Sequence, residues 1–164
     1  MNYIHELQKT LGQIDPSPLP AFVTSCKGTL WLAGNGGSAS VAQHWACDLS
    51  KVSNRRAQAL GSNPAVLTAW ANDASYASAL AEELRRLARE GDALICLSCS
   101  GRSHNILSLF TMAQRLDMPI LLITGAHAPT YPEVPCLVVP HTDYGIIEDC
   151  FQAIGHWLTK EVSG

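Results

Sequence analysis

Charged side chains are scarce in this sequence. Asp, Glu, Lys and Arg make up 15% of the 164 residues, whereas about 25% is typical of soluble proteins. The 11 basic and 14 acidic residues leave a formal net charge of −3, and no run of like charge is available to bind nucleic acid or an anionic membrane. We therefore expect neither partner, and we expect other subunits to cover part of this charge-poor surface.

The sequence also lacks any long hydrophobic run. It has no stretch of 18 apolar residues, and the polar amino-terminal segment MNYIHELQKTLGQ has no apolar centre like that of a signal peptide. Among the six cysteines, Cys96 and Cys99 form a CLSC segment without a second pair, which argues against a structural zinc cluster. Scattered cysteines in apolar segments are typical of reduced thiols, so we expect a cytoplasmic protein.

What the sequence does contain is an alternation of apolar strands with amphipathic helices. This succession predicts one three-layer α/β/α sandwich around a parallel sheet of about five strands, of the flavodoxin or Rossmann type. We expect a single domain over residues 1–164, with an amino-terminal helical segment at 1–27 and a core at 28–162. The expected strands are 29–33, 57–60, 93–97, 120–124 and 136–139, and the expected helices of the core are 38–51, 76–89, 103–116 and 146–162.

Two loops rich in glycine and hydroxyl groups follow expected strands. The first, GNGGSAS at 34–40, leads into a helix that Ser38 is expected to cap, and the second, SCSGRSHN at 98–105, also enters a helix. Either loop alone is equally well explained as a turn with a helix cap. Two such loops at equivalent strand ends favour a phosphate site built from hydroxyls and amides without lysine. Neither loop fits the Walker or GxGxxG patterns of nucleotide-binding proteins.

These segments together resemble the sugar isomerase (SIS) domain family, and within it the phosphoheptose isomerases. The resemblance rests on GNGGS at 34–38, AQHWACDL at 42–49, AND at 71–73, EGDALICLSCSGRSHNIL at 90–107, ILLITG at 120–125 and the terminal IIEDCFQAIGHWL. It covers about residues 28–162. It implies binding of a phosphorylated sugar, aldose–ketose isomerisation, and a homotetramer with sites between subunits, in which the helices at 1–27 and 38–51 take part in packing.

The resemblance also implies which residues hold the sugar phosphate. The family's serine and threonine hydroxyls match the second loop, where Cys99 replaces a threonine, and its sugar-contacting positions match the first loop. Asp73 matches an acidic residue near the substrate, although the sequence allows it equally to be a helix cap for residue 76 onward. The implied binding residues are Asn35, Gly36, Gly37, Ser38, Asp73, Ser98, Cys99, Ser100, Ser103 and Glu148.

Acidic and histidine side chains on two helices form the second expected part of the site. His44 and Asp48 lie four residues apart, and Glu148 and His156 lie eight apart, so each pair shares one helix face. The resemblance implies that Asp48 and His156 move a proton between the first two carbons of the sugar through an enediol. It also implies a zinc ion held by all four residues, which the two imidazoles and two carboxylates suit chemically.

The sequence departs from the family at three of these positions. Asp48 stands where the family has glutamate, Glu148 where it has glutamine, and Ile146 where an arginine usually lies. The missing arginine removes an expected sugar contact, so the substrate can differ from sedoheptulose 7-phosphate. The amino-terminal region is also shorter than in the usual heptose isomerase.

Three functions compete for such a chain. The first is an isomerase that supplies activated heptose for lipopolysaccharide, capsule or a glycosylated metabolite. The second is a non-catalytic SIS protein, such as a partner of the replication initiator, which would lack the acid and the histidine. Asp48 and His156 are both present and favour the enzyme. The third, a sugar-phosphate sensor, needs an attached domain for which the chain has no room.

Overall fold

The fold is a parallel sheet of five strands between two layers of helices. The computed structural model describes residues 2–163. The strands lie in the order β2-β1-β3-β4-β5, and each pairs with its neighbours in parallel. The predicted fold class is confirmed, and each predicted strand lies within one or two residues of an observed one: β1 (Leu30–Ala33), β2 (Ala57–Ala59), β3 (Ala93–Ser98), β4 (Ile120–Gly125) and β5 (Cys136–Val139).

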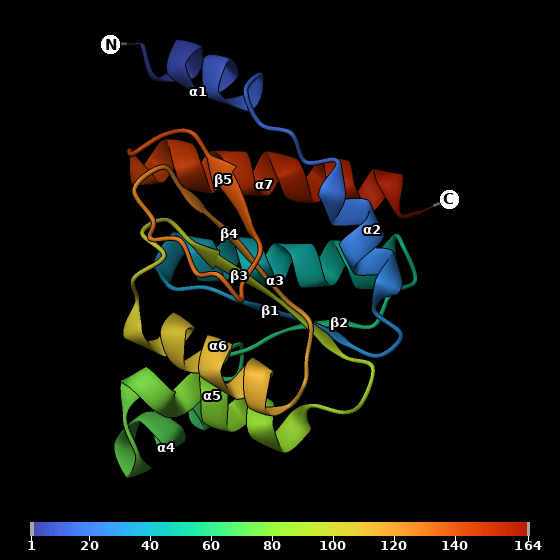
Figure 1. Cartoon of the computed structure of the whole chain (residues 1–164), viewed down its shortest axis with the longest axis vertical. Helices are drawn as coiled ribbons and strands as arrows, with labels where there is room; N and C mark the ends of the chain where they lie inside the picture. The colour runs from blue at the N-terminus through green and yellow to red at the C-terminus, as the bar shows by residue number, and fades with distance from the viewer. Residues whose placement is uncertain (1, 164) are drawn as a thin grey trace.

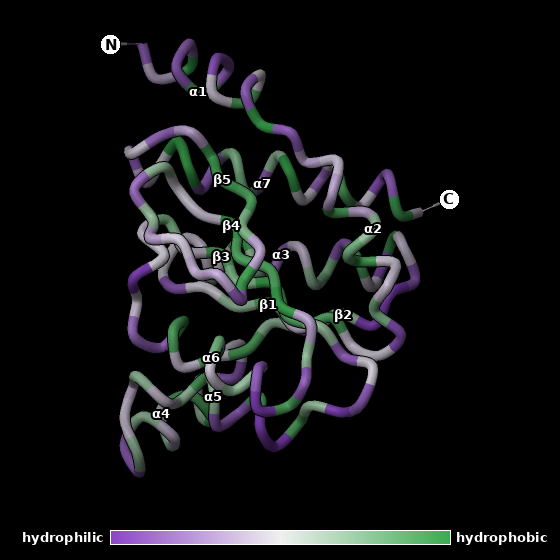
Figure 2. Tube along the Cα trace, in the orientation of Figure 1, coloured by the Kyte–Doolittle hydropathy of each residue, from purple (hydrophilic) through white to green (hydrophobic). Residues whose placement is uncertain are grey.

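The central strands are hydrophobic because helices cover both faces of the sheet. Every residue of β1, β3 and β4 is buried, whereas β5 at the edge is largely exposed. Continuous apolar runs are what parallel strands covered on both sides require. Figure 2 shows this hydrophobic centre running along the strands.

The helices divide into two layers, as Figure 1 shows. One hydrophobic cluster joins α2, α3 and α7 to the sheet, and α1 packs along α7 on the outside of this layer. The other cluster lies beneath α5 and α6, with α4 against α5. The helices are α1 (Tyr3–Leu11), α2 (Pro18–Ser25), α3 (Gly36–Lys51), α4 (Pro64–Asp73), α5 (Tyr76–Leu87), α6 (His104–Arg115) and α7 (Tyr144–Glu161).

The helix predictions differ from the structure by two residues or more at four places, and the start of α3 is described with the site below. Helix α4 was not predicted, and none of its residues is fully buried, although Leu67 packs partly buried against the cluster beneath α5 and α6. Helix α7 begins at Tyr144 instead of 146, because the Asp143 carboxylate accepts a hydrogen bond from the Ile146 N–H at 3.1 Å and caps the helix there. Helix α5 ends at Leu87, two residues before the predicted end.

Helices α3 and α7 lie directly against each other, and one glycine makes their close contact possible. A Cβ at Gly155 would overlap the indole of Trp45. The Trp45 Nε1–H donates to the carbonyl of Phe151 at 3.0 Å, so the ring is fixed against α7. The two helices are thereby held in one register along their length. None of the helices within residues 2–163 is long and apolar enough to cross a membrane.

Candidate active site

A pocket of about 340 Å³ opens where β1 and β3 end. These strands are neighbours in the sheet, so the loops that follow them meet at one edge, where parallel sheets usually bind ligands. The two glycine- and serine-rich loops form most of its wall, and the start of α7 closes it. The pocket is lined by Asn35, Gly36, Gly37, Ser38, Leu97, Ser98, Cys99, Ser100, Ser103, Tyr144 and Glu148.

A pair of carboxamides ties the two loops together. The Asn35 amide donates to Asn105 Oδ1 at 2.9 Å, and the Asn105 amide donates back to Asn35 Oδ1 at 2.7 Å. The Tyr76 hydroxyl also donates to Asn35 Oδ1, at 2.9 Å. Asn105 is buried, so the pair sets a fixed separation between the loops.

Helices α3 and α6 start at the pocket, and their first turns lack the usual cap. Among the described residues, the N-cap side chains Asn35 and Ser103 make no capping hydrogen bond. The N-cap side chains of α1, α4, α5 and α7 all do. Helix α2, whose N-cap Ser17 makes no capping bond either, does not line the pocket. The amides at a helix start are orphan donors with a partial positive charge. Two uncapped starts at one pocket therefore favour an anionic ligand there.

The prediction that Ser38 caps α3 is wrong. Ser38 is the third residue of the helix, and its buried hydroxyl donates to Glu148 Oε1 on α7 at 2.9 Å. The glycines place the helix start two residues earlier than the predicted residue 38, with Gly36 at a φ of +53° that a side chain would disfavour.

The residues that the second loop contributes to the pocket have no charged side chain. Ser98, Cys99, Ser100 and Ser103 all reach the pocket. Burial is the largest cause that raises the pKa of the Cys99 thiol, so the sulfur stays protonated near neutral pH and is not activated as a nucleophile. The loop offers hydroxyl, thiol and amide groups, the donors expected for a phosphate held without lysine.

Glu148 contributes a carboxyl group to the pocket wall. Besides the bond from Ser38, its carboxylate lies 3.9 Å from the Cys99 sulfur. Its oxygens also fill the space over Gly37, where a Cβ would overlap them. Glu148 therefore lines the pocket, and it is not among the three side chains of the group described next. Its predicted role as a metal ligand stays a prediction.

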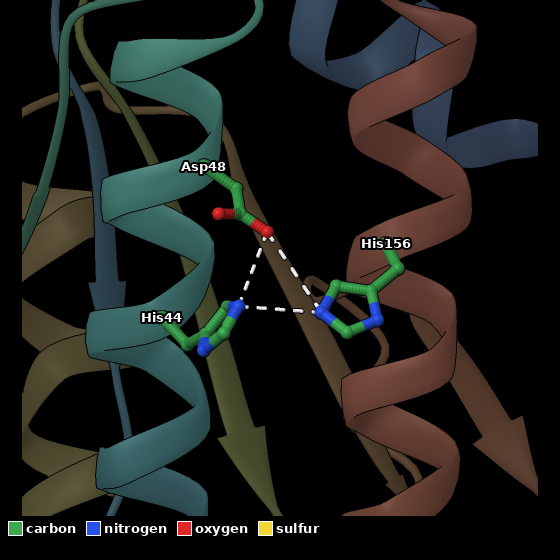
Figure 3. A group of neighbouring side chains, drawn as sticks. All are labelled: His44, Asp48 and His156. Atoms are coloured by element: carbon green, nitrogen blue, oxygen red, sulfur yellow. Dashed lines mark hydrogen bonds and ion pairs between the residues drawn. The ribbon is translucent and has the colours of Figure 1, made fainter.

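Two turns farther along the same helices, three side chains converge (Figure 3). His44 Nε2 lies 3.2 Å from Asp48 Oδ2 and 3.2 Å from His156 Nε2, and His156 Nε2 lies 3.9 Å from Asp48 Oδ2. A tetrahedral zinc ion with bonds of about 2.0–2.1 Å sets its ligand atoms about 3.3–3.4 Å apart. Two of the three separations are thus close to the ligand spacing of a zinc site, and the third, between His156 and Asp48, is longer.

The charge and exposure of this His–Asp–His group suit a cation accessible from solvent. The side chains of His44 and His156 are 50% and 52% exposed, and that of Asp48 is 27% exposed. Imidazole nitrogen and carboxylate oxygen are common zinc ligands, and an open side leaves room for a substrate oxygen.

Asp73 lies away from both parts of the site within this chain. It is the exposed last residue of α4, and its carboxylate accepts a hydrogen bond from the neighbouring Asn72. Its alternative role as a cap of α5 is wrong, because Ser75 caps that helix through a bond from the Ser78 N–H. Its predicted place near the substrate stays a prediction.

A larger cavity of about 580 Å³ lies at the opposite ends of the strands, before β3 and β4 begin. Its buried carboxylate, Asp92, accepts hydrogen bonds from the Thr29 amide, the Trp31 indole and the Arg89 amide. These bonds satisfy both oxygens and join loops to β1, so Asp92 has a structural role.

Comparison with known proteins identifies the family. Residues 21–125 match the SIS domain. The chain belongs to this family. It is 33% identical over 178 residues to the phosphoheptose isomerase of Chlorobaculum parvum, covering 99% of this chain and 85% of the relative. It is 35% identical to that of Rhodospirillum rubrum, covering 80% and 73%. Both matches place this SIS chain among the phosphoheptose isomerases.

Solved structures agree with this placement. The phosphoheptose isomerase GmhA of Neisseria gonorrhoeae superposes with a TM-score of 0.88 at 26% identity, over 98% of this chain and 93% of that one. The phosphoheptose isomerase of Francisella tularensis gives a TM-score of 0.86 at the same identity. The SIS fold of this chain therefore aligns with these two structures over almost its whole length.

Sequence reasoning missed four residues that the SIS chain brings to its site. Asn105 lies in the quoted SCSGRSHN loop, and its place after β3, next to β1, was a signal that it would meet Asn35. Tyr144 lines the pocket, and Tyr76 bonds to Asn35; neither carries a sequence signal. Gln152 lies 2.8 Å from His156, and its i, i+4 spacing was detectable.

Proposed function

We propose that this protein is an aldose–ketose isomerase that converts sedoheptulose 7-phosphate to D-glycero-D-manno-heptose 7-phosphate. The proposal rests on one observation: the pocket between the two loops and the His–Asp–His group lie one after the other along the same two helices, α3 and α7. Glu148 and His156 are eight residues apart on α7, which is about 12 Å at 1.5 Å per residue. A seven-carbon sugar has its phosphate and its reacting carbons at opposite ends, so one molecule suits both parts.

The phosphate end is assigned to the pocket between the two loops. The uncapped starts of α3 and α6 supply amides, and Ser98, Ser100 and Ser103 supply hydroxyls. Cys99 takes the position of a threonine in the resemblance and contributes a weaker donor. Asn35, Gly36, Gly37 and Ser38 form the wall toward the sugar.

Asp48 and His156 are assigned to the proton transfer. Isomerisation moves a proton from one carbon to its neighbour and a second proton between the two oxygens. A carboxylate can take the carbon-bound proton and return it to the adjacent carbon, while an imidazole serves the oxygens. Asp48 and His156 approach from different helices, 3.9 Å apart, so an enediol lying across their solvent-exposed side can contact both.

The His–Asp–His group is proposed to hold a divalent metal, for which zinc fits the donors. Such an ion would stabilise negative charge on the sugar oxygen during the reaction. The metal residues proposed from this chain are His44, Asp48 and His156. Asp48 Oδ2 and His156 Nε2 are the atoms that face this group, so Asp48 Oδ1 and His156 Nδ1 would be left to exchange protons with the sugar.

We further propose a homotetramer in the cytoplasm. Half-exposed His44 and His156 and a helix α4 that buries no residue are features that contacts between subunits would cover. The six cysteines are free thiols, as suits a reducing compartment. The product would supply enzymes that activate heptose for lipopolysaccharide, capsule or other glycoconjugates.

The isomerase proposal is tested by incubating the protein with sedoheptulose 7-phosphate and zinc and following the aldose by NMR. We expect conversion by the wild type and a loss of at least about 100-fold in His156→Ala, within the range attributed to acid–base groups. His5→Ala, on the exposed face of α1, is the matched control and should retain full activity. Absence of conversion by the wild type would reject the proposed reaction, and unchanged turnover in His156→Ala would reject the role of His156.

A further inference from the structure

We propose that the amide oxygen of Gln152 is the fourth side-chain ligand of the metal, in the place predicted for Glu148. The inference rests on the metal site of the proposed function. It assigns a residue that the resemblance does not carry, since the four ligands it implies include Glu148 and omit Gln152.

The group becomes symmetric when Gln152 is included. On α3, His44 and Asp48 are four residues apart, and on α7, Gln152 and His156 are also four apart. Side chains at this spacing stand one above the other on a helix face. The two faces oppose each other because Trp45 packs into the space over Gly155. Each helix therefore contributes one imidazole and one oxygen-bearing side chain to the same place.

Distances and contacts distinguish Gln152 from Glu148. The Gln152 side-chain amide lies 2.8 Å from His156 Nε2, the same atom that faces His44 at 3.2 Å. Glu148 lies one further turn along α7, where its carboxylate accepts the Ser38 hydroxyl. Moving Glu148 to the metal would break that bond, whereas Gln152 is already in contact with the group.

More groups approach the His156 Nε2 atom than one ring nitrogen can hydrogen-bond. His156 Nε2 carries either one proton or one lone pair, yet the Gln152 amide, His44 Nε2 and the Asp48 carboxylate all approach it. A cation bound among them would engage all four groups at once. A half-turn of the Gln152 amide exchanges its nitrogen and oxygen, and this places the oxygen beside His156 Nε2, the atom that also faces His44.

Cobalt(II) binding to the full chain tests this ligand without relying on activity. Cobalt(II) takes zinc sites, and its visible absorption reports the number and type of ligands. We expect Gln152→Ala to weaken cobalt binding about tenfold or more, comparable to losses on altering groups around a metal, and to shift the spectrum. Gln152→Glu restores an oxygen at nearly the same position and should retain a spectrum like that of the wild type.

Two further variants make the result decisive. Gln114→Ala, on the exposed side of α6, is the control and should bind cobalt like the wild type. His44→Ala should abolish the wild-type spectrum. If His44→Ala does so while Gln152→Ala keeps both affinity and spectrum, the Gln152 inference is overturned and the metal site stands. If His44→Ala binds like the wild type, the metal site and the inference are both rejected.

Discussion

Glu148 is an unusual residue for a pocket assigned to phosphate. Its carboxylate is the negative charge among lining residues that otherwise offer hydroxyl, thiol and amide groups. The bond from Ser38 and the space over Gly37 hold it in place. A charge fixed in this way opposes a second negative charge entering the pocket, so Glu148 is expected to limit affinity for the substrate.

Glu148→Gln tests this expectation. Glutamine keeps the oxygen that accepts the Ser38 hydroxyl and removes the charge. We expect KM for the sugar phosphate to fall about fivefold, which corresponds to about 1 kcal/mol of relieved repulsion, with kcat little changed. Glu161→Gln, at the far end of α7, is the matched control and should leave KM as it is. A KM that rises in Glu148→Gln would mean that the carboxylate binds the sugar directly.

At the scale of residues, the sequence predicted where the two glycine- and serine-rich loops lie, but it did not predict which side chains bond to each other. GNGGS and SCSGRSHN carry glycines and hydroxyls that only strand ends and helix starts use together, so their place at the pocket followed from the sequence. The bond between Ser38 and Glu148 joins residues 110 positions apart. No local pattern encodes that pair, and the assignment of Ser38 to the helix cap failed for this reason.

At the scale of elements, the contact between α3 and α7 unites the two halves of the site. Both the pocket and the His–Asp–His group draw one side from each helix. The separation of the helices is set where Trp45 occupies the space over Gly155. A change at that contact should therefore affect stability and the metal site together.

Gly155→Ala is the corresponding prediction. The added methyl group would overlap the Trp45 indole, and overpacking of this kind costs about 1–3 kcal/mol. We expect the free energy of unfolding in urea to fall by about that amount and cobalt affinity to fall with it. Gly12→Ala is the control, because a Cβ there meets its nearest neighbours at 3.6 Å and 3.7 Å. Equal stability of the two variants would contradict the proposed close contact.

The attachment of α1 to α7 gives a prediction with a pH dependence. The Tyr3 hydroxyl donates to Asp149 Oδ2 at 2.7 Å, and this bond is the main cause that raises the pKa of Tyr3 from 10.0 to about 12. Because the folded pKa is the higher one, the stabilisation is fully present below pH 10 and is lost as the pH rises through 12.

Tyr3→Phe isolates this contribution. The difference in Tm between the wild type and the variant should be constant below pH 10 and should shrink between pH 10 and 12. A spectrophotometric titration of the two proteins gives the ionisation of Tyr3 by subtraction. A Tyr3 that titrates at the ordinary value of 10.0 would show that the bond to Asp149 does not hold α1 in solution.

The strands β1, β3 and β4 were predictable because each is a short apolar run that is buried along its whole length. Helix α4 was not, since none of its residues is fully buried and its start depends on Asn63, whose side chain accepts the Ala65 N–H at 3.0 Å. Pro64 at the first helical position was the available signal. Helices that face the sheet leave an apolar stripe in the sequence, whereas a helix packed on the outside leaves mainly its cap.

At the scale of the whole molecule, the scarcity of charge and the exposed metal group point in the same direction. A single chain leaves His44 and His156 half-exposed and α4 without buried residues. Light scattering at micromolar concentration should give a mass about four times the 17.6 kDa of one chain. A monomer under these conditions would reject the tetramer, and the charge-poor surface would then need another partner.

The carboxylate in the pocket has a consequence for the choice between anions. A phosphate monoester has a second pKa of about 6 and so still carries a proton in part of its molecules near neutral pH, whereas sulfate carries none. A fixed carboxylate accepts a hydrogen bond from the protonated form and repels the fully ionised one. Glu148 would thus favour phosphate over sulfate of the same shape, and the pocket would distinguish the two anions by a single proton.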